Sequence, residues 1–386
     1  MMPRLLLILL SAILTLGARA SAADSLRVSF VNFHPGAEVY ELEGHSALRI
    51  TTPESDMAVT YGVFSFDQPN FIYRFVKGET DYSVAAVPWR YFLQHYLDNN
   101  RRVVEHIIPL DSIQRQRLLG LLDTNLMPQN RVYRYNYVKD NCATRPLRIL
   151  ELAIGDSIIL PAPDAAATFR SVMRRYHRNY PWYQFGIDLS LGPGIDYDIN
   201  ARELAFAPVV LDSMLPDATT GGAPLVAGTI VVNEGSDATL PPTPWPLHPL
   251  TVCWAVFAIG IAITVADLRR RCVSRWFDTI IFGVFGIEGL ILTFLIFISV
   301  HEATSPNYLY AWLNPAALIV PVFVWIKRCK PLVTWYFFVN FAVVLCFAVT
   351  WLFSPQQYNP AFLPLVLLDM ARSASYLYIT QKQKPV

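Results

Sequence analysis

Cysteine is scarce in this chain of 386 residues, which has five cysteines, and only Cys142 precedes the strongly apolar C-terminal part. Residues 24–246 therefore contain no second cysteine with which Cys142 could form a disulfide. Extracytoplasmic cysteines are normally paired. An unpaired cysteine in an exported segment is either an inert buried thiol or a reactive one.

Other features are also missing. The sequence has no basic stripe with interleaved aromatic residues, no glycine-rich phosphate loop and no internal repeat, and its formal net charge is only +1. A nucleic-acid partner is therefore not expected. No metal or organic cofactor is expected either.

The N-terminus has the pattern of a secretory signal peptide. Arg4 is followed by an apolar stretch, 5–16, and then by the small residues of a cleavage site. We expect residues 1–23 to be the signal peptide, with cleavage between Ala20 and Asp24.

The rest of the chain divides into three parts by composition. Residues 24–210 have the mixed composition of a soluble domain, and 211–246 are a connector rich in Pro, Gly and Thr with one short strand near 225–232. Residues 247–386 are predicted to form a transmembrane domain of about five helices. Its apolar runs are 249–267, 277–300, 311–326, 332–353 and 360–378.

The distribution of basic residues predicts the membrane topology. Arg269–Arg271 and Arg275 follow the first run, Lys327 and Lys330 follow the third, and the loops between the other runs have no Lys or Arg. Because positive residues stay in the cytoplasm, five spans place the 24–246 segment outside and the C-terminus inside. The chain is thus expected to be integral to a membrane, with residues 24–246 on its outer side.

The exported part mixes strand and helix patterns. Strands are predicted at 26–33, 46–51, 59–66, 71–76 and 103–110, with a turn at 67–70. Helices are predicted at 88–99, 111–122 and from Cys142 to Gly155. This order predicts a single α+β extracytoplasmic domain, followed by the all-α membrane part.

Cys142 and His45 are the candidate catalytic pair. Asp140 or Asn141 is a good N-cap, so Cys142 lies at the predicted N-terminus of a helix. There the helix dipole and free N–H groups favour a thiolate and could hold an oxyanion. His45 leads a predicted strand and could deprotonate the thiol. The alternative is that Cys142 only packs and His45 is an ordinary core histidine.

Several other residues are candidates for roles at the site. A third group must orient the imidazole, and Tyr61, Asp67 and Asp140 are candidates for it. Arg145 either binds a phosphate or carboxylate of the substrate or pairs with Asp140.

A second set of candidate substrate-binding residues comes from the membrane part. His301, Glu302 and Asn307 occupy one external loop, and Glu288 lies within a span, where a carboxylate is costly. For the loop residues we consider two functional roles, binding of a lipid headgroup or docking of the exported domain. The alternative is that they are only the polar residues found at the end of any span.

An ordered set of motifs resembles a known family. The motifs are Gly44-His45-Ser46-Ala47-Leu48-Arg49-Ile50, Tyr61-Gly62-Val63-Phe64-Ser65-Phe66, Asn70-Phe71 with Phe75 and Gly78, and Asp140-Asn141-Cys142-Ala143-Thr144-Arg145. They resemble the Lnb N-terminal periplasmic domain of Lnb-type lipoprotein N-acyltransferases over about 25–210. The last motif departs from the expected Cys-Thr-Thr-Arg by one residue that does not affect the thiol. The histidine-before-cysteine order is also similar to permuted NlpC-like, papain-related thiol folds.

The resemblance implies a function. The catalytic pair would be Cys142 and His45, the acyl donor a membrane phospholipid and the acceptor a diacylated lipoprotein, with a cysteine thioester between two acyl-transfer steps. Two other functions stay open. One is a cysteine hydrolase acting on cell-wall peptides or lipids, and the other is a non-enzymatic membrane scaffold.

Overall fold

The computed structural model describes residues 26–382, which form two compact units. The first unit contains the chain up to Phe71, Thr80–Ala167 and Asp198–Leu240. The second contains Ile72–Glu79, Thr168–Tyr197 and the chain from Pro241 onwards. The predicted signal peptide, 1–23, lies outside the described residues.

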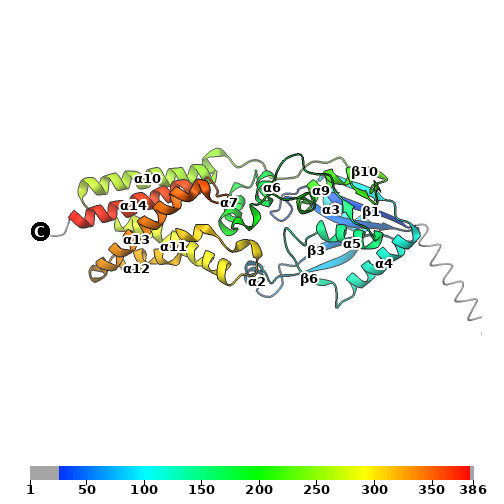
Figure 1. Ribbon diagram of the computed structural model, residues 1–386, viewed down its shortest axis with the longest axis horizontal. Coiled ribbons are helices and arrows are strands. Elements are labelled where there is room, and N and C mark those ends of the chain that lie inside the picture. The colour runs from blue at the N-terminus through cyan, green and yellow to red at the C-terminus, as the bar shows by residue number, and fades with distance from the viewer. Residues whose placement is uncertain (1–25, 383–386) are drawn as a thin grey trace, which may run out of the picture. The chain divides into compact units, whose positions relative to one another are not determined.

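The first unit is built on a seven-stranded antiparallel sheet in the order β10-β5-β1-β2-β3-β4-β6 (Figure 1). The strands are β1 (Arg27–Phe33), β2 (His45–Thr51), β3 (Asp56–Val63), β4 (Asp81–Pro88), β5 (Val103–Ile108), β6 (Val132–Arg134) and β10 (Gly228–Asn233). A second sheet joins β7 (Ile158–Ile159), β8 (Thr219–Thr220) and β9 (Ala223–Pro224). The central strand β2 begins at His45.

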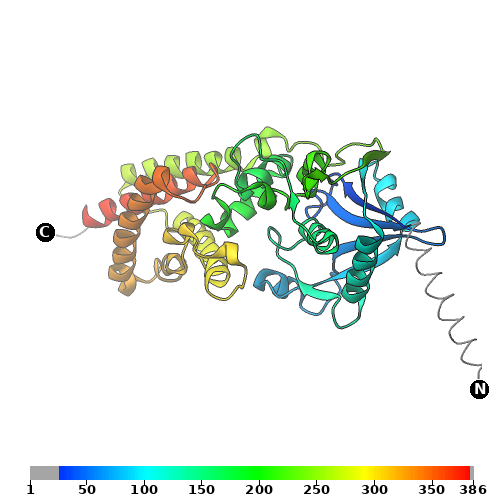
Figure 2. The ribbon, with the colours of Figure 1, turned by 45° about the vertical axis from the view of Figure 1, so that its right-hand side comes forward.

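Helices cover both faces of the large sheet. On one face, Phe33 of β1 stacks on Tyr96 of α3 (Trp89–Asp98), with ring centroids 3.8 Å apart. Neighbouring residues of a strand point to opposite faces, so Asn32 of β1 points away from α3. On that opposite face it donates to Asp212 of α9 (Pro208–Met214) at 3.3 Å. On the sheet also pack α4 (Ser112–Leu126) and α5 (Thr144–Ile154), which lie side by side (Figures 1 and 2).

Most strands and helices predicted for the exported part are confirmed, but the strand predicted at 71–76 is wrong. That segment is the helix α2 (Phe71–Lys77), which follows the predicted turn and ends at Gly78 with φ +81°. Its aromatic content suits a strand as well as a helix, so composition did not decide between them. Sequence patterns also missed β4. The helix predicted from 111 is confirmed, because Asp111 and Gln114 form a capping box.

The expected connector at 211–246 needs correction. Its first part completes α9, and β8, β9 and β10 follow, with β10 paired to β5 at the edge of the large sheet. The predicted short strand is present, but the segment as far as Leu240 belongs to the first unit.

Within the residues that the structure describes, the second unit contains four helices long and apolar enough to span a membrane. They are α10 (Pro249–Arg270), α11 (Arg275–Phe297), α13 (Lys330–Thr350) and α14 (Phe362–Lys382). Among them, α14 packs between α10 and α13 (Figure 1). The expected span at 311–326 is instead a broken segment ending in the short α12 (Ile319–Phe323), because Pro315 and Pro321 interrupt it. The unit also holds α6 (Phe169–Tyr176) and α7 (Pro181–Ser190).

Arg372, Asp267 and Asp278 lie on three of these long helices and form an ion-pair network. Arg372 of α14 binds Asp278 of α11 at 2.7 Å and Asp267 of α10 at 2.9 Å. Asp369 accepts from Asn340 of α13 at 2.6 Å. Intramembrane charges are tolerated when they face the bundle interior and pair, which explains why the last apolar run carries both Asp369 and Arg372.

A second polar network fixes the edge of the large sheet in the first unit. Asp212 accepts hydrogen bonds from His106 at 2.7 Å and His34 at 3.2 Å, and His34 also contacts the half-exposed Asp237 at 3.1 Å. Burial lowers the pKa of His34, but its bonds to Asp212 and Asp237 outweigh burial, so the pKa is raised. Burial raises the pKa of Asp212, but His106 and His34 outweigh it and hold that pKa well below its usual range.

This network yields a stability prediction. Replacing Asp212 with Asn should lower the free energy of unfolding of the full chain by about 1–3 kcal/mol, because buried donors lose a charged acceptor. The loss should be larger at pH 6 than at pH 8. The pKa of His34 is raised in the folded state, so its protonation stabilises the fold fully below the unfolded pKa of about 6.5. This stabilisation is lost as pH rises through the folded pKa.

The matched control is Asp237→Asn, which removes a half-exposed partner of the same histidine and should cost less than about 1 kcal/mol. Unfolding is followed by circular dichroism in detergent. Equal effects of the two substitutions would contradict the assigned role of Asp212.

Candidate active site

Cys142 lies in a tight turn directly before α5, so the predicted position near a helix N-terminus is right to within two residues. Asn141 holds this turn. Its Oδ1 accepts the N–H groups of Ala143 and Thr144 at 2.9 and 3.0 Å, as expected of a capping residue. Its Nδ2 donates to the carbonyls of Tyr137 at 2.7 Å and Phe206 at 2.8 Å. The amide thus ties the turn to two other parts of the unit.

The Cys142 thiol is buried, with 7 % of the residue exposed. Burial raises the pKa of the thiol to about 11, although hydrogen bonding from the Ser46 N–H and the Tyr135 hydroxyl favours the thiolate and opposes the shift. Ser46 directly follows His45 on β2. The fold therefore brings the sulfur to the start of the central strand.

His45 occupies that start, and its ring turns toward the face of the sheet covered by α3. The rings of Phe33 and Phe92 each lie 6.2 Å from it, and Nε2 is 2.7 Å from Oγ1 of Thr60. Burial, aided by the charge of Arg101, lowers the pKa of His45 to about 3. Histidine and thiol are therefore both neutral near pH 7, and in the described residues no hydrogen bond joins them.

Thr60 is the residue that holds the imidazole, and sequence reasoning missed it. Tyr61, a candidate for this role, comes next on β3 and so points to the opposite face. Asp67 is exposed in the turn before α2 and is not hydrogen-bonded to His45 among residues 26–382. The role of Thr60 follows from the pairing of β2 with β3. Thr60 pairs with Ala47, which lies two residues after His45 and so points to the same face of the sheet.

Asp140 and Arg145 pair with each other. The Arg145 Nε and Nη2 lie 2.6 and 2.7 Å from the two carboxylate oxygens of Asp140. The guanidinium also stacks on Tyr133, 3.5 Å from the ring centroid. Of the two roles considered for Arg145, the structure shows the pairing, and Asp140 is not available to orient His45.

The four membrane candidates all belong to the second unit. Glu288 is half-buried on α11, and Glu302 is exposed. His301 contacts the carbonyl of Phe75 through Nε2 at 2.9 Å. Asn307 is buried, donating to the Leu189 carbonyl at 2.8 Å and accepting from Gln356 at 3.0 Å. Asn307 thus has structural partners.

The space beside the sulfur is small. A cavity of about 30 Å³ touches Cys142, and its wall comprises Tyr40, Glu43, Gly44, Tyr135, Tyr137, Asn141, Phe206 and Pro208. That volume suffices for about one water molecule. Gly44 is required at its position, because φ is +85° and a Cβ would lie 2.4 Å from the Phe33 carbonyl oxygen. The resting site is therefore closed to any larger substrate.

A row of aromatic side chains runs from this cavity to the surface. Tyr135 stacks on Tyr82 with centroids 4.4 Å apart, and Tyr82 meets Phe64 at 5.3 Å. Phe64 in turn contacts Phe66 at 5.0 Å and Tyr40 at 5.7 Å, which are 63 % and 53 % exposed. We call these five residues the aromatic row. It offers continuous apolar surface ending at the sulfur.

The described residues, 26–382, contain no group of three His, Cys, Asp or Glu side chains arranged to hold a metal ion.

The raised thiol pKa predicts a specific pH dependence of alkylation. Because the thiolate is the reactive form, modification of Cys142 by iodoacetamide should accelerate about tenfold per pH unit between pH 7 and 9. Tyr135→Phe should slow it at each pH, since the hydroxyl that favours the thiolate is lost. The rate is measured by mass spectrometry of the peptide containing Cys142. A pH-independent rate in this range would contradict the neutral pair and indicate a thiolate–imidazolium pair.

Comparison with known families gives two matches. Residues 15–175 match the Lnb N-terminal periplasmic domain, and residues 242–384 match the Lnb transmembrane domain. No curated protein and no solved structure matches the chain. A periplasmic domain joined to a transmembrane domain indicates a protein of the inner membrane, and the family points to a lipoprotein-modifying enzyme. With both domains of the family present in the same order, the chain belongs to the Lnb-type family.

Proposed function

We propose that this protein is a lipoprotein N-acyltransferase that uses Cys142 as its nucleophile and His45 as the proton acceptor and donor. The sulfur would attack an ester carbonyl of a membrane phospholipid while its proton passes to His45. The departing glycerol oxygen takes that proton, which leaves a thioester on Cys142 and releases a lysophospholipid. The α-amine of a diacylglyceryl-cysteine lipoprotein then attacks the thioester, its proton passes through His45 to the sulfur, and the free thiol is restored.

The observation that carries this proposal is the aromatic row ending at a buried thiol. A fatty acyl chain needs apolar surface as far as the reacting carbonyl, and the row supplies it from Phe66 and Tyr40 to Tyr135. A polar wall peptide gains nothing from such a surface. The long apolar helices support the same choice, because donor and acceptor are both anchored in a bilayer.

The pKa values favour proton transfer coupled to attack rather than a preformed ion pair. The thiol pKa of about 11 and the imidazole pKa of about 3 make the ion pair unfavourable in the closed site. General-base catalysis does not require the pair to form first, because the proton can move as the carbon–sulfur bond forms. Thr60 would keep the imidazole in place during this step.

The donors for the oxyanion differ from the helix N–H groups that the sequence suggested. Asn141 already occupies the N–H groups of Ala143 and Thr144. The N–H groups of Ser46 and Cys142 itself point at the sulfur. An oxyanion formed beside the sulfur would be held by these two preorganised donors.

Orientation is part of the proposal. With the first unit in the periplasm, the basic residues after α10, before α13 and at the end of α14 place the C-terminus in the cytoplasm. In this topology α11 ends on the periplasmic side and α13 begins on the cytoplasmic side. The broken segment 308–323 must therefore cross the bilayer between them.

Hydrolysis is the competing outcome. The cavity beside Cys142 has room for about one water molecule, and water could attack the thioester in place of an amine. The protein would then be a thiol-dependent lipid hydrolase, and free fatty acid would accumulate without any triacylated lipoprotein.

The nucleophile is tested by substitution. Cys142→Ala and His45→Ala should each lower N-acylation of a diacylated lipoprotein by at least about a thousandfold, because a covalent mechanism loses its nucleophile or its base. The readout is the mass of the lipoprotein N-terminus after reaction in vesicles. Cys272→Ala is the matched control, since it removes an exposed cysteine of the second unit, outside both cavities, and should leave the rate unchanged. Normal triacylation by Cys142→Ala would rule out the thioester route.

The aromatic row is tested separately. Phe66→Ser should reduce the rate with a long-chain phospholipid about tenfold, since contacts between apolar surfaces on the order of 1.5 kcal/mol are lost. The rate with a short-chain thioester should stay the same. Ile113→Ser changes a residue of α4 with nearly the same exposure, 62 %, and serves as the control. Equal losses with long and short acyl chains would argue against a role of the row in lipid binding.

A further inference from the structure

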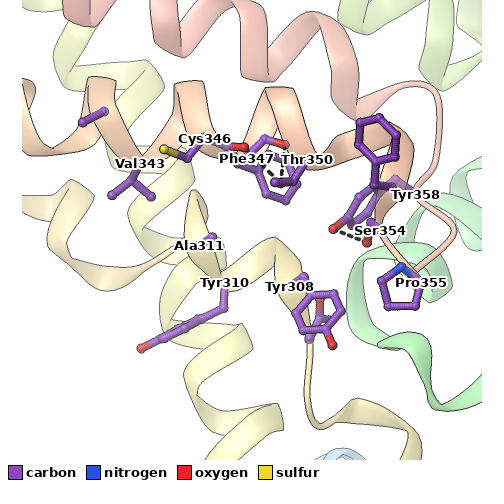
Figure 3. A pocket seen from close by; sticks show the side chains of 13 residues that line it. Tyr308, Tyr310, Ala311, Val343, Cys346, Phe347, Thr350, Ser354, Pro355 and Tyr358 are labelled. Carbon is purple, nitrogen blue, oxygen red and sulfur yellow. Dashed lines mark hydrogen bonds between the residues drawn. The ribbon is translucent and has the colours of Figure 1, made fainter.

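A groove opens in the second unit, between α13 and the segment 307–311 (Figure 3). Its volume is about 750 Å³, within the range of about 300–1,000 Å³ that is typical of small-molecule sites. The α13 side consists of Ala342, Val343, Cys346, Phe347 and Thr350. Their spacing of one, three or four residues places them on one stripe of the helix.

The two ends of the groove differ in chemistry. Ala342, Val343 and Cys346 give one end an apolar wall. The other end has the hydroxyl groups of Tyr308, Ser354 and Tyr358, and Ser354 Oγ lies 2.9 Å from the Tyr358 hydroxyl (Figure 3). We call these three residues the hydroxyl rim. No Asp, Glu, Lys or Arg lines the groove.

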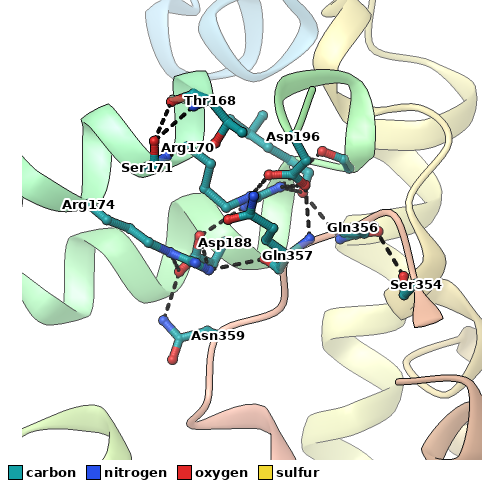
Figure 4. A network of polar contacts seen from close by, with 12 residues as sticks. Thr168, Arg170, Ser171, Arg174, Asp188, Asp196, Ser354, Gln356, Gln357 and Asn359 are labelled. Carbon is teal, nitrogen blue, oxygen red and sulfur yellow. Dashed lines mark hydrogen bonds and ion pairs between the residues drawn. The ribbon is translucent and has the colours of Figure 1, made fainter. Parts of the chain in front are cut away.

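The loop that supplies the rim is held by a buried polar network (Figure 4). Gln356 is 2 % exposed and donates to Asn307 at 3.0 Å. The Gln357 N–H donates to Asp196 at 3.0 Å, and Asn359 donates to Asp188 at 2.9 Å. These bonds fix the groove mouth to the segment 188–196.

One buried arginine anchors both acids of the network. Arg170 of α6 binds Asp188 at 2.9 Å and Asp196 at 2.7 Å, and its side chain is fully buried. The rim is thus set by an ion-pair network that continues from α6 and α7, so its geometry is preorganised rather than formed by the ligand.

We propose that this groove binds one acyl chain of a membrane glycerophospholipid, with the chain along α13 and the ester group at the hydroxyl rim. Ester carbonyls accept hydrogen bonds, and hydroxyl groups can donate them. The uncharged lining leaves the phosphate outside the groove. This inference rests on the proposed acyl transfer, because the lipid bound in the groove would be the acyl donor of that reaction.

The phospholipid is preferred over the diacylglyceryl group of a lipoprotein as the occupant. Both carry acyl esters, but the groove is open along its side to the surroundings of α13, where Val343 and Cys346 are exposed. A site open to the bilayer is occupied according to concentration and affinity. Phospholipid is the bulk component of that bilayer.

The test uses the full chain carrying Cys142→Ala, which cannot react, in vesicles of phosphatidylethanolamine and phosphatidylglycerol. A small fraction of the phosphatidylethanolamine carries a diazirine at the end of one acyl chain. After irradiation, peptide mass spectrometry should find crosslinks concentrated at the α13 stripe. Cys346→Trp, which fills the groove, should lower them at least about tenfold, and Leu345→Trp, exposed on the same helix outside the groove, should not.

The same two tryptophan variants are then compared with Cys142 intact. Cys346→Trp should raise the KM for phospholipid about tenfold, and Leu345→Trp should leave it unchanged. Crosslinks spread evenly over the lipid-facing positions of α13 would overturn the groove as a site. Stronger labelling by a diazirine-bearing diacylated lipopeptide than by the phospholipid would overturn the choice of occupant.

Failure of the proposed function would look different. In that case the groove would still be labelled and blocked by Cys346→Trp, but the protein with Cys142 intact would transfer no acyl chain. Conversely, normal acyl transfer by Cys346→Trp would leave the transferase in place and remove the groove from its mechanism.

Discussion

The site depends on the hydrogen bonds of one side-chain amide, that of Asn141. It closes the turn of Cys142 through the N–H groups of Ala143 and Thr144, and it fastens this turn to the carbonyls of Tyr137 and Phe206. These bonds are buried, and leaving such groups unpaired costs about 1–3 kcal/mol each. Through them the sulfur is held against Ser46 at the start of the central strand.

The same burial that positions the sulfur also makes it unreactive. Removing a thiol from water raises its pKa, and removing an imidazole lowers its pKa, as found for Cys142 and His45. The cavity of about 30 Å³ admits no acyl chain. A closed site of this kind admits about one water molecule, which limits the access of bulk water to a thioester.

Sequence reasoning predicted the features that depend on local patterns. The strands near 26–33, 46–51 and 103–110, the helix that begins at Asp111 and the helix start close to Cys142 all follow from residue type and spacing. The role of Thr60 and the aromatic row could not be predicted, because both depend on strand register and on residues far apart in the chain. The segment 71–76, expected as a strand, is a helix, because its aromatic content suits both structures. The span expected at 311–326 is broken, because Pro315 and Pro321 interrupt it.

In the second unit, too, the sequence predicted the features that depend on neighbouring residues but not the contacts between residues far apart in the chain. Hydropathy identified the four long spans, since each is a continuous local run. The pairing of Arg372 with Asp267 and Asp278 joins three helices, and the network of Arg170 joins α6 to the loop before α14 through Asp188 and Asp196. Such partners are known only once the helices are packed. They convert residues that look costly in a span or loop into fixed contacts.

The central claim is that the sulfur of Cys142 carries an acyl chain. The most direct measurement is the intact mass of the protein after brief incubation with phospholipid vesicles in the absence of lipoprotein. The account predicts a mass increase of one fatty acyl group on the peptide containing Cys142, which neutral hydroxylamine removes. Release of lysophospholipid with no acyl group on this peptide, even in rapidly quenched samples, would contradict it.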